Sequence, residues 1–410
     1  MLKSLHVENF KNLADVEAEF GSINAIIGPN GCGKSSLLQA IDFLRAFFYP
    51  SIEDYLREKG YDYSDLPNLR RAGKAIRWKL RAQLGPDSKG QCAGEYEYEV
   101  TARRWRYLGV GEEKLSYTSQ AGEKVLLFDR AGRKIKGFGD DAVPHHDLAL
   151  VNVPRSLMAD IDPKLKARYP QMWRFHEWIT SFRSFLIWDP KVLRRADRGK
   201  HEELGQSGEH LAPVLANLRR ADPEKFAKVV ARIKRLFPTV TDIAIRGPRT
   251  WGWQEISLIE GDGRNVSFNS QQMSDGVLRL LAICTFLYAD KVPQVLMFEE
   301  PENGIHPQLI GEVIQILREL TLRKPPSECQ VLFTTHSPYV LDELYDHPDQ
   351  VYVMERGRPQ QGASLYRLSD RQDVDLVKAL FKHSLGEAWF SGLIGGTAKG
   401  TGQWARPRSA

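Results

Sequence analysis

Residues Gly28–Ser36 read GPNGCGKSS and come directly after the apolar run Ile23–Ile27. The apolar run predicts a short buried strand. From Ser35 to Phe48 the apolar residues recur at helical spacing, and Pro50 ends that pattern. A glycine-rich loop between a strand and a helix lets backbone N–H groups turn around an anion without Cβ clashes, and the helix start adds positive charge. The stretch therefore predicts a phosphate-binding loop in an α/β fold.

The loop fits the pattern GxxxxGK[ST], which is called Walker A. Lys34 is expected to reach the β- and γ-phosphates of ATP, and the Ser35 hydroxyl to hold Mg²⁺. The alternative is a glycine-rich turn that binds nothing. Residues 2–20 are expected to form two short strands with Lys11 and Asn12 at the turn between them, and both residues are expected to bind nucleotide. The full set of expected nucleotide-binding residues is Lys11, Asn12, Gly28, Pro29, Asn30, Gly31, Cys32, Gly33, Lys34, Ser35 and Ser36.

A second apolar strand, Val295–Phe298, ends in two adjacent acids. In a P-loop fold such a strand lies beside the P-loop strand, so its last residues come close to Mg²⁺ and the γ-phosphate. We expect Glu299 to hold the metal, directly or through water, and Glu300 to act as general base on the attacking water. Glu302 is expected to be solvated or to support the other acids. The alternative is a strand end with two solvated carboxylates.

Two further segments could bind phosphate. Ser274, Asp275 and Gly276 precede an apolar helix and are expected to form a second anion site, used by the γ-phosphate that a partner holds. Taken alone, they indicate a capped core helix, and their position before the acid-tipped strand of a P-loop protein favours the anion site. His336 follows a buried strand and is expected to contact the γ-phosphate or orient the water. The alternative is a structural histidine.

These four pieces, in this order, resemble the ABC-type ATPases of the SMC, RecF and OLD class, and more narrowly the AAA_21 family of stand-alone bacterial AAA ATPases. The resemblance covers roughly residues 1–50 and 240–345. It implies an α/β P-loop NTPase fold, an ABC-type head with an antiparallel β lobe and a helical insertion lobe. It also implies a homodimer or higher oligomer that sandwiches two ATP molecules, with Ser274 of one copy facing the phosphate held by Lys34 of the other.

Other consequences of the resemblance concern single positions. Asn303 and Gly304 fall in the D-loop of such ATPases. The signature reads SDG instead of SGG, and Asp275 is expected to point away toward the helix end. Position 299 is Glu where transporters use Asp. The glutamine that couples ATP to the helical lobe is not placed, and Gln83 and Gln91 are both candidates.

The chain is expected to divide into five parts. Strand-like segments between glycine turns predict an antiparallel meander, and an Arg- and Lys-rich helical stretch follows it. The parts are an ATPase core (1–50 and 240–345), a β-rich lobe (51–154), a helical insertion lobe (155–239), a C-terminal extension (346–396) and a disordered tail (397–410). Residues 384–396, SLGEAWFSGLIGG, are expected either to pack on the core or to bind a partner protein.

Composition limits the setting. The 410 residues carry a net charge of +5, which permits nucleic-acid contact without requiring it. The four cysteines are far apart and show no CxxC spacing, which predicts a reducing compartment and no zinc site. The absence of a signal peptide and of a long apolar run predicts a cytoplasmic protein without membrane contact.

The leading functional prediction is an ATPase whose dimerisation responds to ATP. It would be the sensor or regulatory subunit of a bacterial anti-phage or anti-plasmid defence system and would control a separate effector, a nuclease or toxin encoded nearby. The alternative is a RecF-like DNA repair or recombination ATPase, in which the Arg-rich segments bind DNA instead of forming a solvated face. A transporter ATPase is disfavoured because the sequence shows no membrane domain and no segment typical of a helix that couples an ATPase to one.

Overall fold

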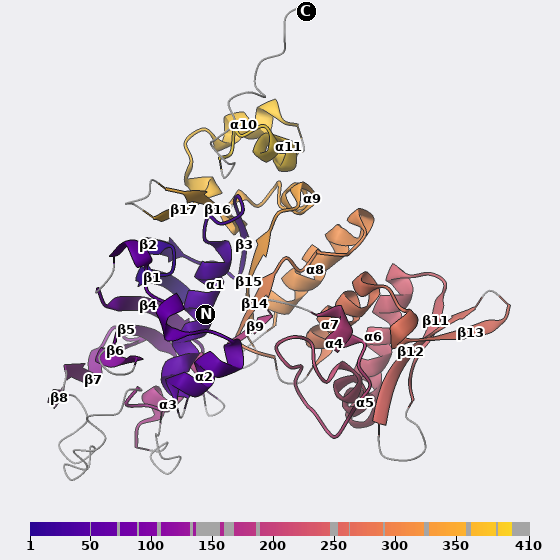
Figure 1. The fold of residues 1–410 in the computed structure, drawn as a ribbon, viewed down its shortest axis with the longest axis horizontal. Coiled ribbons are helices and arrows are strands. Elements are labelled where there is room, and N and C mark those ends of the chain that lie inside the picture. Colours follow the sequence, from indigo (N-terminus) through magenta and orange to yellow (C-terminus); the bar gives the residue numbers. More distant parts are fainter. Residues whose placement is uncertain are drawn as a thin grey trace, which may run out of the picture. The chain divides into compact units, whose positions relative to one another are not determined.

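The computed structural model describes residues 1–49, 51–71, 74–87, 90–104, 108–131, 134–136, 156–159, 168–185, 189–246, 253–261, 263–289, 292–323, 328–357, 362–382 and 384–395. The chain forms two compact units. Unit 1 contains Met1–Phe182 and Leu344–Ala410, and unit 2 contains Arg183–Glu343. Figure 1 shows the elements of both units. The predicted tail, residues 397–410, lies outside the described residues.

Unit 1 contains the predicted antiparallel meander as a seven-stranded sheet in the order β2-β1-β4-β5-β6-β7-β8. Its strands are β1 (Leu2–Phe10), β2 (Leu13–Glu19), β4 (Ile76–Leu84), β5 (Gly94–Arg104), β6 (Leu108–Ser119), β7 (Lys124–Ala131) and β8 (Lys134–Lys136). Strict alternation along β4 buries Trp78 and Leu80 on one face and exposes Arg77 and Lys79 on the other. One face of the sheet is therefore apolar and the other charged.

The apolar face of this sheet packs against helix α1 (Lys34–Phe43) through aromatic side chains. The Trp78 ring stacks on Phe43 with 5.6 Å between centroids and meets Phe10 edge to face. The Trp78 indole N–H donates to the carbonyl of Ala40 at 3.0 Å. The helix that follows the phosphate loop is thereby fixed to the sheet.

The rest of unit 1 consists of three further strands and several helices. Strand β3 (Ile23–Ile27) pairs in parallel with β16 (Val351–Arg356), which pairs antiparallel with β17 (Ala363–Arg367). The helices are α2 (Ile52–Lys59), α3 (Pro170–Thr180), α10 (Val374–Leu380) and α11 (Leu385–Phe390). Helix α2 was not predicted, because its apolar residues are few and irregularly spaced.

Helix α11 fits the expectation that residues 384–396 pack on the rest of the chain, and the expectation that they bind a partner protein stays a prediction. Leu385 and Ala388 are buried, so the helix packs on its neighbours. Phe390 is 85% exposed, and Leu376 and Leu380 of α10 are also largely exposed. The segment therefore has a packed side and an uncovered apolar side.

Unit 2 contains a parallel sheet in which β14 (Val295–Glu299) lies between β9 (Arg183–Phe185) and β15 (Gln330–Thr335). Its other strands, β10 (Asp197–Arg198), β11 (Val240–Arg246), β12 (Trp253–Gly261) and β13 (Asn265–Asn269), form an antiparallel sheet. The helices are α4 (Pro190–Leu193), α5 (Leu211–Ala221), α6 (Pro223–Leu236), α7 (Asp275–Tyr288), α8 (Ile310–Thr321) and α9 (Pro338–Asp342). The short strands β9 and β10 were not predicted within the helix-rich stretch.

The observed elements confirm the predicted fold class, an α/β P-loop architecture with an antiparallel β lobe and a helical lobe. None of the helices in the described residues is long and apolar enough to cross a bilayer.

A buried ion pair attaches α2 to α1 in unit 1. The Lys59 ammonium lies 2.6 Å from the Asp42 carboxylate, and both side chains are almost fully buried. Tyr55 donates to the same carboxylate at 2.7 Å, and Arg45 lies 3.5 Å from it. Burial acts to raise the pKa of Asp42, but Lys59 and Arg45 hold it below its usual value.

Replacing Lys59 with Met is expected to lower the free energy of unfolding by about 3 kcal/mol, because the buried Asp42 carboxylate loses its closest cation. Urea unfolding at neutral pH measures the loss. The wild-type protein should lose the same contribution as the pH falls through the lowered pKa of Asp42. The control is Lys79→Met, which breaks an exposed pair with Glu99 and should cost less than about 1 kcal/mol. Equal losses in the two variants would contradict the role given to Asp42.

Candidate functional site

The phosphate loop of unit 1 is fixed by close backbone packing. Gly28, Gly31 and Gly33 all have positive φ, at 151°, 72° and 125°. A Cβ atom at Gly28 would lie 2.2 Å from the carbonyl oxygen of Met354 and 2.8 Å from the Cys32 sulfur. A side chain at Gly28 would therefore push the loop away from β16. At Gly31 the same atom would meet nothing within 4 Å.

Lys34 lies inside the turn of this loop and is only 6% exposed. Its ammonium donates to the carbonyl oxygens of Gly28 at 2.8 Å and of Pro29 at 3.1 Å. A buried cation that is held by neutral carbonyls favours an additional anionic partner. Helix α1 begins at Lys34 with no acidic residue in its first turn and no side-chain cap from Gly33. This geometry fits the phosphates of ATP.

Asn12 contacts the loop, and Lys11 contacts helix α1, which follows it; the expectation that both bind nucleotide stays a prediction. The Asn12 amide donates to the Gly31 carbonyl at 3.3 Å, and its Oδ1 is buried without a hydrogen-bond partner among the described residues. The Lys11 ammonium donates to Gln39 at 2.7 Å and lies 4.2 Å from the centre of the Tyr61 ring. Burial lowers the pKa of Lys11, although Asp65 opposes the shift.

A hollow of about 380 Å³ adjoins the loop on the side of these two residues. Its lining residues are Lys11, Asn12, Gly31, Cys32, Asp65, Pro67, Asn68, Leu69, Arg70, Arg356, Gly357, Gly362 and Ala363. Sequence reasoning missed the contributions of residues 65–70 and of Arg356. They lie far from the motif along the chain and follow no spacing rule. The volume and the mixed polar and apolar lining fit a nucleoside beside a phosphate loop.

The predicted catalytic acids lie in unit 2. Glu299 is the last residue of β14 and pairs with Thr334 of β15. Glu300 has a φ of 47°, which is unusual for a residue with a side chain, and its N–H donates to the Thr334 carbonyl at 3.1 Å. The His336 ring lies 3.3 Å from the Glu300 carboxylate, and each side chain is 34% exposed. The structure thus brings together the predicted base and the predicted histidine.

Glu302 does not have the solvated position that was one expectation for it. It is 8% exposed, and the Thr335 hydroxyl donates to its Oε1 at 2.5 Å. Burial raises the pKa of Glu302, and the hydrogen bond from Thr335 only partly offsets this. Glu302 therefore ties the loop after β14 to the last residue of β15, in agreement with a supporting role.

The predicted signature residues begin helix α7 in the same unit. Ser274 is the N-cap and accepts a hydrogen bond from the Val277 N–H at 3.4 Å. Asp275 pairs with Arg194, which also donates to the Met273 carbonyl at 2.9 Å. The Asp275 carboxylate is thus engaged within its own chain, and its expected orientation toward the helix end stays a prediction. Arg194 was missed, because nothing in the sequence relates it to residue 275.

The signature and the D-loop residues touch directly. A Cβ atom at Gly276 would lie 2.6 Å from the Gly304 carbonyl oxygen, so only glycine permits this approach. The Asn303 N–H donates to the Glu300 carbonyl at 3.0 Å. Burial lowers the pKa of Arg279 on α7, while the charges of Asp275, Glu300 and Glu302 act to raise it. Arg279 is therefore a further basic residue near the acids, and the motifs did not reveal it.

The positions of Gln83 and Gln91 do not identify either of them as the glutamine that couples ATP to the helical lobe. Gln83 lies in β4, and the Gln91 N–H donates to Asp87 in the turn before β5. Neither is among the described residues that line the hollow beside the loop.

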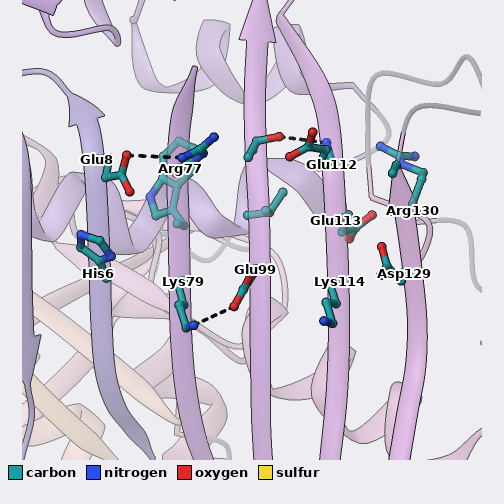
Figure 2. A pocket seen from close by; sticks show the side chains of 14 residues that line it. His6, Glu8, Arg77, Lys79, Glu99, Glu112, Glu113, Lys114, Asp129 and Arg130 are labelled. Atoms are coloured by element: carbon teal, nitrogen blue, oxygen red, sulfur yellow. Dashed lines mark hydrogen bonds and ion pairs between the residues drawn. The ribbon is translucent and has the colours of Figure 1, made fainter. Parts of the chain in front are cut away.

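A second hollow of unit 1, about 350 Å³, lies on the charged face of the seven-stranded sheet (Figure 2). The Lys79 ammonium lies 2.8 Å from Glu99, and Arg77 lies 3.8 Å from Glu8 across neighbouring strands. Glu112 and Asp129 add further carboxylates to the rim. Because acids compensate the bases here, the surface does not suit a phosphate backbone.

Replacing Gly28 with Ala should lower the free energy of unfolding by about 1 to 3 kcal/mol, because the added carbon overlaps a backbone oxygen that cannot rotate away. Urea unfolding of the full chain measures the loss. Gly31→Ala is the matched control, since it places the same methyl group at positive φ in open space and should cost only about 1 kcal/mol of backbone strain. A loss at Gly31 equal to or larger than that at Gly28 would refute the packing described for the loop.

Comparisons with known proteins agree with this geometry. The chain is similar to the DNA replication and repair protein RecF of Shewanella loihica, with 24% identity over 201 residues that cover 48% of this chain and 51% of the relative. It is also similar to the OLD nuclease of Thermus scotoductus, with 44% identity over 55 residues, 13% of this chain and 10% of the relative. These matches thus span at most about half the length of the two relatives.

Among solved structures, an Smc head bound to the C-winged helix domain of ScpA matches with a TM-score of 0.53 and 12% identity, and covers 89% of this chain and 97% of that one. This likeness supports the fold. A family described as "AAA domain, putative AbiEii toxin, Type IV TA system" matches residues 23–342. The chain therefore belongs to this AAA family, and the comparisons confirm the predicted class, the ABC-type ATPases of the SMC, RecF and OLD class.

Proposed function

We propose that this chain binds ATP with Mg²⁺ and hydrolyses the γ-phosphate at sites shared by two copies. One observation carries the proposal. The phosphate loop holds a buried Lys34 on neutral carbonyls, and the same chain supplies a partly exposed Glu300 in contact with His336. The chain thus has both a place for the triphosphate and a base for water.

Each residue has a distinct task in this proposal. Lys34 exchanges its carbonyl partners for phosphate oxygens, and Asn12 orients the loop through Gly31. Ser35 and Glu299 hold Mg²⁺, which when bound neutralises charge on the phosphates. Glu300 accepts the proton of the attacking water, and His336 positions the Glu300 carboxylate.

The proposed dimer follows from the signature segment. Ser274 caps α7, so its hydroxyl and the helix start form an anion site. Asp275 is paired with Arg194, which reduces the repulsion that a free carboxylate would exert on phosphate. We propose that this site binds the γ-phosphate held by the Lys34 of a second copy.

The variant Glu300→Gln should hydrolyse ATP at least about a hundredfold more slowly, because the amide cannot accept the proton. Since the phosphate contacts remain, the variant should accumulate as a dimer in the presence of ATP and Mg²⁺. Single-turnover hydrolysis and light scattering after size exclusion measure the two effects.

Adding Ser274→Arg to Glu300→Gln gives the matched control for dimerisation. The larger side chain blocks the signature site but leaves the Lys34 loop unchanged, so the double variant should bind ATP as a monomer. Wild-type turnover by Glu300→Gln would refute the base. A double variant that still forms the ATP dimer would refute the shared site.

We further propose that the ATP state controls a separate effector, a nuclease or toxin encoded nearby, in defence against phages or plasmids. The family description names a toxin of a toxin–antitoxin system, and one relative is a nuclease. The uncovered apolar residues Leu376, Leu380 and Phe390 of α10 and α11 offer this effector a binding surface.

The tagged chain, expressed with its neighbouring genes, should co-purify with the effector, and Phe390→Asp should lose it. Because the Phe390 side chain is exposed and the buried Leu385 is unchanged, we expect this variant to keep the fold. Val125→Asp, at another exposed apolar residue, is the control and should retain the effector.

Absence of any bound neighbour in the wild type would contradict effector control. If duplex DNA instead stimulates ATP hydrolysis and added salt removes the stimulation, the RecF-like alternative gains support. That alternative rests on the RecF match over about half of the chain.

A further inference from the structure

Three potential metal ligands come together in unit 2, away from the residues assigned to ATP. Asp197 lies in β10, His201 follows four residues later, and His210 is the residue before α5. One ligand atom from each lies within 4.8 Å of the others. The chemical types, two imidazoles and one carboxylate, match the protein ligands of open zinc sites.

The chain path explains why these residues meet. Gly199 and Gly208 have φ values of 106° and 93°, so the segment turns sharply after β10 and again before α5. The Gly208 N–H donates to the Gly205 carbonyl at 3.0 Å, which closes the second turn. His210 itself has a φ of 68°, a strained conformation for a residue with a side chain.

The side chains already interact. Asp197 contacts the Nδ1 of His210, and the rings of His201 and His210 stack with 3.6 Å between centroids. The Asp197 carboxylate and the His210 Nδ1 face each other, so a metal ion would take the place of the proton between them and bind both atoms. Parallel rings do not aim at one point, so the nitrogens converge after a ring rotation. All three residues are partly exposed and have room for it.

Nearby bases are engaged elsewhere and do not fill this cluster. The Arg198 guanidinium lies 5.3 Å from the centre of the Trp253 ring. Arg183 pairs with Glu203 at 2.8 Å, and Arg194 pairs with Asp275. Within the described part of unit 2, Asp197 pairs with His210 and with no ammonium or guanidinium, so a divalent cation would meet two imidazoles and a carboxylate.

We propose that Asp197, His201 and His210 bind a divalent transition metal such as Zn²⁺, with water in the remaining position. Such a site differs from the Mg²⁺ site of the nucleotide, because imidazole ligands favour zinc and its neighbours over magnesium. The spacing of the cysteines predicted no zinc site, and this cluster uses none of them. The metal would join the β10 turn to the start of α5.

The test is a titration of the full, metal-free chain with Co²⁺ alone, without nucleotide. We expect one Co²⁺ per chain at this site and visible ligand-field absorption of a low-symmetry site. His210→Asn removes the imidazole but suits the positive φ and the helix start, so the fold should remain. His210→Asn and His201→Asn should each weaken binding at least about tenfold and abolish the absorption.

His347→Asn, at a histidine in unit 1 outside every proposed site, is the matched control and should bind as the wild type does. Equal unfolding midpoints without metal establish that His210→Asn is folded. Wild-type protein that gives no ligand-field absorption, or variants at 201 and 210 that bind Co²⁺ as tightly as His347→Asn, would overturn the proposal.

Discussion

The proposed nucleotide site of unit 1 depends on one contact. The Lys34 ammonium donates hydrogen bonds to the carbonyl oxygens of Gly28 and Pro29. Enclosing a cation at 6% exposure is costly unless strong acceptors surround it. Two of these acceptors are the neutral carbonyls of Gly28 and Pro29. The loop can be this tight only because Gly28 lies against the Met354 carbonyl, where no side chain fits. Backbone packing thus keeps the loop in a form that favours an anion.

The acids of unit 2 differ in their surroundings, and this separates their roles. Glu300 is one third exposed and in contact with His336, so its carboxylate can reach solvent water. Glu302, two residues later, is buried against the Thr335 hydroxyl, and its pKa is raised by that burial. A carboxyl with a raised pKa is a poor partner for Mg²⁺ but can link the loop after β14 to the end of β15. One short segment therefore supplies the proposed base and a structural acid.

The sequence predicted the motif-bearing elements well and the residues around them poorly. The loop, strands β3, β14 and β15 and helix α7 follow from apolar runs next to glycine, acid or serine, because those patterns are local. Arg194, Arg356 and Glu302 were missed or left open, since their roles depend on contacts between segments distant along the chain. Helix α2 was also missed. Its apolar residues are few, and it is attached to α1 partly by the buried pair of Lys59 and Asp42, which no local pattern reveals. Pattern reasoning has no access to such pairs.

Contacts within unit 2 connect the proposed catalytic acid to the proposed signature residues. Glu300 accepts a hydrogen bond from Asn303, the next residue is Gly304, and the Gly304 carbonyl packs against Gly276. This approach leaves no space for a side chain, so a displacement of the D-loop must displace the start of α7 as well. Asp275 extends the series to Arg194 and hence to the segment that leads into β10. Close-packed backbone transmits small displacements. A change in what Glu300 binds would therefore displace Ser274, the residue proposed to face the phosphate held by a second copy.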